Sequence, residues 1–233
     1  MKIEKNIIII VFISLFNFVH ANNPDSTKIE VIKFEDGDLI KFRNASINTN
    51  KYQMLEFSPD SLYCAISNDL RYGESQGYFI YNINGEKINH ELINGRDIKI
   101  FNDGRFVIYE PIYSESLFIS KSTLKFYNNN AKEIMNNYFF NEVILLKVLE
   151  NNFLLIVHQK SISPSDIINH RIELVLLNED FNIISKNGKL LLDLKLIGNI
   201  ILDNEKNGII IQDKLKENSI YKHLDLNLDE ISN

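Results

Sequence analysis

The stretch YFIYNINGEKI, residues 78–88, decides the fold that this sequence predicts, because related stretches return three times downstream. They are LKFYNNNAKEI from Leu124, ELVLLNEDFNII from Glu173 and HLDLNLDEIS from His223. The asparagine after each hydrophobic run falls at a spacing of 46, 50 and then 49 residues, at Asn82, Asn128, Asn178 and Asn227. A period of this size, made of short apolar runs and turn residues, is typical of an array of small β-sheets.

A second element recurs ahead of each asparagine and has the pattern of a β-hairpin: an apolar run, a polar tight turn, and a run rich in β-branched and aromatic residues. Its turns contain the pairs Pro59-Asp60, Asp103-Gly104, Asn151-Asn152 and Asn207-Gly208. Glycine and asparagine tolerate the positive φ that such turns need. Two hairpins per period predict four strands, near 53–57, 61–67, 77–82 and 86–93 in the first full unit, with similar sets near 96–134, 143–185 and 190–232.

The predicted fold class is all-β, a β-propeller-like array of four to five four-stranded blades, complete or incomplete. A partial unit at residues 29–44, with Asp36-Gly37 as its turn, precedes the full ones. Three arrangements remain open: a small closed ring, an open arc, or part of a longer protein. Aromatic side chains are expected to fill the space between neighbouring blades, namely Tyr78, Phe79, Tyr81, Phe106, Phe126, Phe139, Phe140 and Phe153.

The N-terminal residues MKIEKNIIIIVFISLFNFVHA predict a secretory signal, with a charged start, an apolar core and a small residue at the cleavage site. A transmembrane anchor is the competing interpretation. The apolar core is interrupted at Asn17 and His20, however, and is shorter than the roughly 20 residues of a spanning helix. We therefore expect a signal peptide at residues 1–21, a propeller-like domain at residues 22–233, export to the periplasm or the extracellular space, and no stable membrane insertion after cleavage.

The net charge of −6 argues against a nucleic-acid partner, which a basic surface would attract. The single cysteine, Cys64, excludes an intramolecular disulfide. It lies within the apolar-rich run LYCAI, so we expect a buried and inert thiol.

Residues 57–88 carry a resemblance to a known family. The turn Ser58-Pro59-Asp60, the aromatic-rich strand from Tyr78 and the turn Asn84-Gly85 are similar to the WD40-like repeat of bacterial propellers of the TolB type. Ser61 stands where such repeats usually have glycine after the aspartate. The resemblance implies a propeller fold and no particular activity, because such propellers serve many roles.

The sequence contains no nucleophile elbow, zinc-ligand cluster, phosphate-binding glycine loop or EF-hand loop. His158 and His170 flank a long connection, but two nitrogens without a third ligand make a weak metal site. Asp36 and Asp38 are explained by a solvated turn. We therefore expect no enzymatic activity, no cofactor and no metal.

The connections between the second and third strands of the blades are long, at residues 68–77, 110–122 and 158–170. Their aromatic, acidic and basic side chains suit a protein or peptide partner, and the candidate binding residues are Arg71, Tyr72, Glu74, Tyr113, Glu115, His158 and Lys160. The sequence thus predicts an exported, non-enzymatic interaction module that uses the loops of one face. One alternative is an accessory propeller of a larger hydrolase or sensor; another is a set of solvated loops without a ligand.

Overall fold

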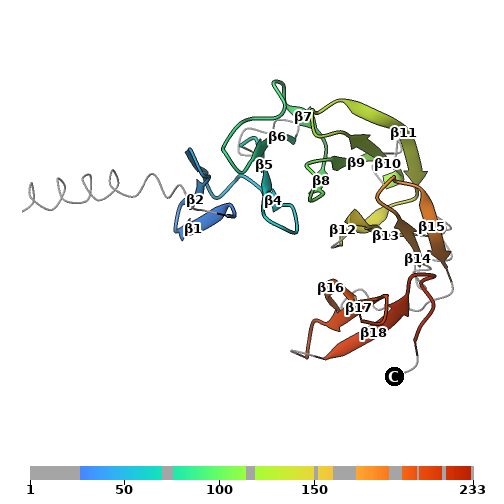
Figure 1. Ribbon diagram of the computed structural model, residues 1–233. Helices are drawn as coiled ribbons and strands as arrows, with labels where there is room; N and C mark the ends of the chain where they lie inside the picture. Colours follow the sequence, from blue (N-terminus) through green and yellow to red (C-terminus); the bar gives the residue numbers. More distant parts are fainter. Residues whose placement is uncertain are drawn as a thin grey trace, which may run out of the picture. The chain divides into compact units, whose positions relative to one another are not determined.

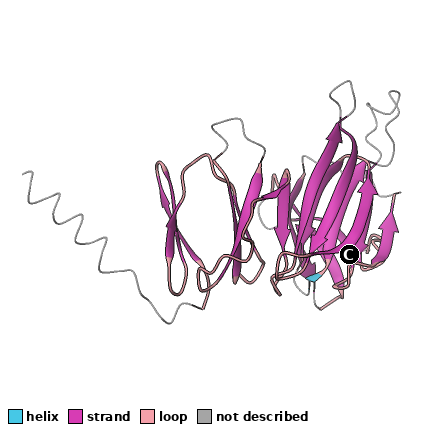
Figure 2. Ribbon diagram, turned by 90° about the horizontal axis from the view of Figure 1, so that it is seen from above, coloured by secondary structure: helices cyan, strands magenta, loops and turns pink. Residues whose placement is uncertain are grey.

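The computed structural model describes residues 27–69, 76–113, 119–149, 152–159, 172–188, 196–203, 205–216 and 219–231. The chain divides into two compact units, Met1–Ile93 and Asn94–Asn233. Across the described residues the structure consists of strands and turns, with no α-helix; the short cyan piece in Figure 2 is a 3₁₀ turn at Asn152. Accordingly, that part of the chain has no helix with the length and hydropathy needed to cross a bilayer. The expected signal peptide at residues 1–21 lies outside the described residues.

The first unit contains two antiparallel sheets. One has the order β1-β2-β3, with β1 (Glu30–Phe34), β2 (Gly37–Lys41) and β3 (Ser46–Asn48). The other has the order β4-β5-β6-β7, and its strands are β4 (Leu55–Phe57), β5 (Tyr63–Ser67), β6 (Gly77–Asn82) and the two-residue β7 (Ile93–Asn94), which reaches the boundary of the second unit. Both follow chain order, because consecutive strands pair antiparallel with each other.

The second unit contains three sheets in the same up-and-down order (Figure 1). Sheet C consists of β8 (Asp97–Ile100), β9 (Phe106–Tyr113), β10 (Ile119–Tyr127) and β11 (Glu133–Phe140). Sheet D consists of β12 (Val143–Val148), β13 (Leu154–Gln159), β14 (Ile172–Leu177) and β15 (Ile183–Asn187). Sheet E has three strands, β16 (Ile197–Asp203), β17 (Gly208–Asp213) and β18 (Ile220–Asp225).

Five successive antiparallel sheets of three or four strands confirm the all-β, propeller-like array that the repeat predicts. Two details differ from the expectation. The strand expected at 86–93 is reduced to one bridge, between Tyr81 and Lys87, followed by β7. The partial unit gains a third strand, β3. Backbone and side-chain hydrogen bonds between Asp38 of β2 and Thr49, which follows β3, hold this strand to β2.

One turn recurs after the third strand of four sheets. Its first residue accepts hydrogen bonds at the side-chain oxygen from the backbone N–H groups that follow: Asn84 and Glu86 donate to Asn82, and Asp180 and Asn182 donate to Asn178. Asn128 does the same, and in sheet E the position is held by Asp225, which accepts from Asp229. The alignment of Asn227 with the earlier asparagines was therefore wrong by two residues, because a carboxylate oxygen accepts these bonds as well as an amide oxygen does.

The fourth residue of each recurring turn has a positive φ, and glycine holds that position only once. The residues are Gly85 at 82°, Ala131 at 58°, Phe181 at 61° and Leu228 at 66°. Bulky residues rarely adopt this conformation. The first hairpins of the sheets behave likewise, with positive φ at Ser61, Gly104, Asn152 and Asn207. The serine that replaces the usual glycine after Asp60 thus adopts the conformation that glycine favours.

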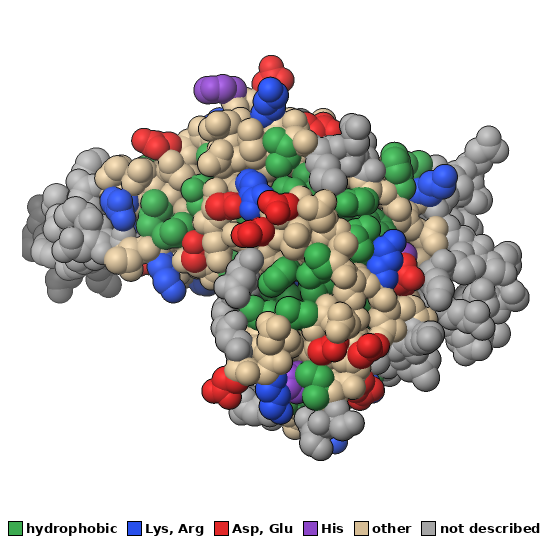
Figure 3. Space-filling model, turned by 45° about the vertical axis from the view of Figure 1, so that its right-hand side comes forward, with side chains coloured by type: hydrophobic (Ala, Val, Ile, Leu, Met, Phe, Trp, Pro, Cys, Tyr) green, Lys and Arg blue, Asp and Glu red, His purple; other side chains and the backbone are tan. Residues whose placement is uncertain are grey.

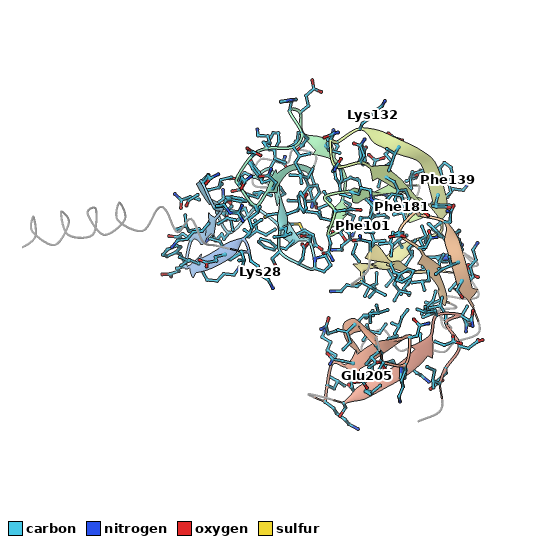
Figure 4. All side chains as sticks on the ribbon, viewed as in Figure 1. Lys28, Phe101, Lys132, Phe139, Phe181 and Glu205 are labelled. Atoms are coloured by element: carbon cyan, nitrogen blue, oxygen red, sulfur yellow. The ribbon has the colours of Figure 1, made fainter. Side chains whose placement is uncertain are left out.

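The core between sheets C and D shows why Phe181 holds its position. Its ring packs 5.2 Å from that of Phe101 and 4.5 Å from that of Phe126, centroid to centroid. Figure 4 shows Phe101 and Phe181 close together within the second unit, whereas Phe139 points outward from β11. Phe139 is 64% exposed, so the expectation that it fills the space between blades was wrong. Its neighbour Phe140 is buried instead, because successive side chains of a strand face opposite sides.

Candidate functional site

Sheets C and D have two different ends. The turn end carries the short turns at 101–105, 128–132, 149–153 and 178–182. The loop end is the opposite one, where β9 ends and β10 begins, β13 ends and β14 begins, and Asn141 and Glu142 join β11 to β12. Because neighbouring strands are antiparallel, all long connections of these two sheets leave from the loop end.

The turn end is closed by bonds between the two sheets. The backbone N–H of Asn102 donates to Asn152 Oδ1 at 2.9 Å, and the Tyr138 hydroxyl donates to the Phe181 carbonyl at 3.0 Å. Arg105 donates to the Glu179 carbonyl at 2.6 Å, and its guanidinium lies 4.8 Å from the centre of the Phe181 ring. The polar groups that this end brings together are thus engaged in holding the sheets to each other.

The loop end has a hollow of about 210 Å³ between sheets C and D, which we call the Glu173 hollow. Its lining comes from β10, the end of β11, β13, β14 and β15, and consists of Lys121, Phe139, Phe140, Asn141, His158, Glu173 and Lys186. His158 lies directly opposite Glu173 in the β13–β14 ladder. Lys186 lies opposite Val175, which is two residues beyond Glu173 and therefore on the same face. The apolar core between the sheets thus ends here in charged side chains.

His158 is 6% exposed and is held from three sides. Its Nδ1 lies 2.8 Å from the carbonyl oxygen of Gln159, so this nitrogen carries the proton of that hydrogen bond. Its ring packs 4.8 Å from the ring of Phe140. Its Nε2 lies 3.2 Å from Glu173 Oε2, within ion-pair distance, but is buried without a hydrogen bond. The polar group that this buried nitrogen faces is therefore the carboxylate of Glu173.

The two lysines of the Glu173 hollow differ from the other charged groups around them. Both side chains are exposed, and within the described part of the chain neither ammonium group has an ion-pair or hydrogen-bond partner. The carboxylate of Glu173, by contrast, lies against His158. Lys121 and Lys186 are therefore the uncompensated charges of a hollow in a protein that is acidic overall.

A second hollow, of about 380 Å³, opens at the same end on the other side of the β11–β12 connection. It is lined by Arg96, Asp97, Tyr109 and residues 142–146. Glu142 is fixed there by Gln159, whose side-chain amide donates to Glu142 Oε2 at 3.0 Å. Charges of both signs thus line both hollows, together with aromatic side chains in the Glu173 hollow and mainly aliphatic ones in the second hollow. Figure 3 shows hydrophobic side chains interleaved with charged ones on the surface that it draws.

Most candidate binding residues from the sequence cannot be placed in this geometry. Arg71, Tyr72, Glu74, Glu115 and Lys160 lie outside the described residues. Tyr113 ends β9, and only its backbone is described. His158 was expected in a connection but lies inside β13 and is buried, because the strand continues through His158 and Gln159 with both paired to β14. The sequence analysis missed Phe139 and Lys186 as surface candidates, and only their tertiary placement brings them to the hollow.

Two other chemical candidates are buried within the fold. Cys64 is fully buried, as expected. This burial raises the pKa of its thiol well above the ordinary value, and the nearby carboxylate of Glu56 is a second, smaller cause of the rise. His223 Nε2 lies 3.1 Å from Asp203 Oδ2, and its side chain is 2% exposed. No group of three or more potential metal ligands occurs among the described residues.

The class of protein that these sheets define is an all-β, propeller-like repeat protein. No family model and no curated protein matches the chain. Among solved structures, it is similar to a protein of unknown function from Bacteroides caccae, with a TM-score of 0.43, 11% identity, and coverage of 88% of this chain and 76% of that one.

Two further solved structures are similar to this chain. The β-propeller domain of the trilobed protease from Pyrococcus furiosus, with an open velcro topology, gives a TM-score of 0.41 and 10% identity, covering 88% of this chain and 80% of that one. Apo AztD from Citrobacter koseri gives a TM-score of 0.37 and 12% identity, covering 89% of this chain and 69% of that one.

Proposed function

We propose that the protein is an exported, non-enzymatic β-propeller-like module that binds a protein or peptide partner at the loop end of sheets C and D. The observation that carries the proposal is the asymmetry between the two ends. The turn end uses its polar groups to join the sheets, whereas the loop end has two hollows and two unpaired lysines. Surfaces that combine aromatic, aliphatic and charged groups suit protein partners.

The finer family assignment is also part of the proposal. We infer that the second sheet is a WD40-like repeat of the TolB type. Its Ser58-Pro59-Asp60 turn supports this, since Ser58 Oγ donates to Asp60 Oδ1 at 2.6 Å and the N–H of Leu62 donates to the same oxygen at 3.0 Å. Export is supported by the pattern of residues 1–21. Sequencing of the mature N-terminus after cell fractionation tests it, and an intact N-terminus in the cytoplasm would contradict it.

Partner binding is tested by capture from a native extract, with three forms of the mature chain compared at equal concentration. The loop-end variant combines Lys121→Glu with Phe139→Ser, and the matched turn-end variant combines Lys132→Glu with Ile134→Ser. Both pairs change one lysine and one exposed hydrophobic residue of sheet C. We expect a partner, identified by mass spectrometry, that is retained by the wild type and the turn-end variant and lost by the loop-end variant.

Equal retention by all three forms, or retention by none above background, would refute binding at the loop end. Circular dichroism and a denaturation midpoint confirm that each variant is folded. Hydrolytic activity of the purified chain would contradict the non-enzymatic assignment and favour the hydrolase alternative.

A further inference from the structure

We propose that the Glu173 hollow is a carboxylate-binding site, which takes one acidic side chain or the C-terminal carboxylate of a peptide and places the neighbouring apolar group against Phe139. The inference rests on the proposed function and gives it a ligand chemistry. The binding groups are the ammonium groups of Lys121 and Lys186, which line the hollow together with the His158–Glu173 pair.

The charge of the hollow favours an anion. Glu173 lies against His158 at 3.2 Å, which leaves both lysines uncompensated among the described residues. Lysines that converge on one hollow repel each other, and an anion between them relieves that repulsion. β10 of sheet C supplies Lys121 and β15 of sheet D supplies Lys186, so the two lysines that line the hollow come from different sheets.

His158 keeps the carboxylate of Glu173 away from the lysines. The hydrogen bond at Nδ1 and the ring contact with Phe140 fix the orientation of the imidazole. Its Nε2 faces Glu173 Oε2 at 3.2 Å, so this carboxylate is directed at the histidine and, among the described residues, pairs with neither Lys121 nor Lys186.

The size of the hollow and the charges of its lining residues determine which anions fit it. A volume of about 210 Å³ is below the range of roughly 300–1,000 Å³ that is usual for drug-sized ligands, so it suits a single side chain or a chain terminus. Glu173 stands at the same site and disfavours a doubly charged phosphate more than a singly charged carboxylate. The exposed ring of Phe139 adds an apolar surface for the group next to the carboxylate. A carboxylate on a short apolar stem satisfies all three features.

The probe is the α-amide of N-acetyl-glutamate, which carries a single carboxylate and is called N-acetyl-glutamate below. It is titrated into the isotope-labelled mature chain while backbone amide shifts are followed by NMR. We expect saturable shifts at Lys121, Phe139 and Lys186, with a dissociation constant of about 1 mM, and none with the neutral N-acetyl-glutamine amide. The double variant Lys121→Gln/Lys186→Gln should weaken binding by about tenfold or more. The control Lys132→Gln removes an exposed lysine from the turn end and should bind as the wild type does.

Shifts that are absent at 20-fold excess over that constant, roughly 20 mM, or equal for the neutral amide, would overturn the carboxylate site. Inorganic phosphate forms a second arm, and tighter binding of phosphate than of N-acetyl-glutamate would also overturn it. The proposed function fails separately: probe binding without a captured partner supports the site and refutes the binding module. Loop-end capture of a partner without probe binding supports the module and refutes the site.

Discussion

The turn end and the loop end of sheets C and D are built by the same eight strands but hold different kinds of contact. At the turn end, a backbone conformation that is costly for bulky residues recurs because the side chain at Phe181 fills the space between the sheets. At the loop end, Phe139, Lys121 and Lys186 are exposed, and neither lysine has an ion-pair or hydrogen-bond partner among the described residues. The difference teaches that one end maintains the fold, while the other has groups available for a ligand.

The largest effect should come from replacing one aromatic residue at each end by alanine and comparing the two losses of stability. Phe181→Ala should lower the free energy of unfolding by about 3–5 kcal/mol, because a buried ring is lost while the positive φ remains. Phe139→Ala, at the exposed loop-end position, should cost less than about 0.5 kcal/mol. Urea denaturation of both variants measures the difference. Similar losses for the two would break the comparison.

The second effect concerns the side-chain oxygen that organises each recurring turn. Asn178→Ala should destabilise the protein by about 1–2 kcal/mol, because the N–H groups of Asp180 and Asn182 lose their acceptor. Asn178→Asp should be nearly neutral, since Asp225 already fills this role in sheet E. The denaturation midpoints of the two variants decide between them, and equal losses would show that the oxygen is not what matters.

The third effect has the opposite sign. Ala131→Gly should stabilise the protein by about 0.5 kcal/mol, because glycine adopts a φ of 58° without the steric cost that alanine bears. The same turn position thus responds to substitution in two directions, depending on whether its side chain packs. Thermal denaturation is a sufficient measurement. A destabilised variant would imply that the Ala131 methyl group contributes to packing.

The smallest effect distinguishes a lysine that has an ion-pair partner from lysines that have none among the described residues. Lys121→Gln and Lys186→Gln should change the free energy of unfolding by less than about 0.5 kcal/mol. Lys125→Gln should cost about 0.2–1 kcal/mol, because Lys125 Nζ lies 2.7 Å from Glu110 Oε2.

The pH dependence of this paired lysine follows from its hydrogen bond to Glu110, which holds the pKa of the Lys125 ammonium group above its ordinary value of 10.5. The contribution to stability is therefore complete below pH 10.5 and disappears as the pH rises through the raised pKa. A loss from Lys121→Gln that equals the loss from Lys125→Gln would contradict the assignment of Lys121 as unpaired.

The sequence predicts the strands and turns well because their signals are local. Gly104 and Asn152 have the positive φ expected of their turns, and β4 to β6 lie within the expected ranges. The error of two residues at Asn227 arises where the repeat has diverged most and the organising residue is an aspartate.

The candidate site was less predictable because it depends on tertiary structure. Lys121 and Lys186 are 65 positions apart in the chain, and only the packing of sheet C on sheet D places them at one hollow. The exposure of Phe139 and the burial of Phe140 depend on the register of β11 with β10, which alternation in an apolar run does not reveal. His158 was misplaced because the four buried apolar residues of β13 are followed within the same strand by a polar histidine that is also buried.

The hydrogen bonds at the turn end also have a direction along the chain. Asn102, Arg105 and Tyr138 of sheet C donate to acceptors in sheet D, and Asn187 of sheet D donates to the Leu228 carbonyl next to sheet E. The same order holds in the first unit, where Arg43 donates to the Ile83 carbonyl. In these three pairs of neighbouring sheets the named donors therefore lie on the earlier sheet, whereas at the loop end the N–H of Val143 in sheet D donates back to Ser122 Oγ in sheet C. During translation, an earlier sheet is complete when its successor leaves the ribosome, so the array is suited to assemble vectorially from the N-terminus.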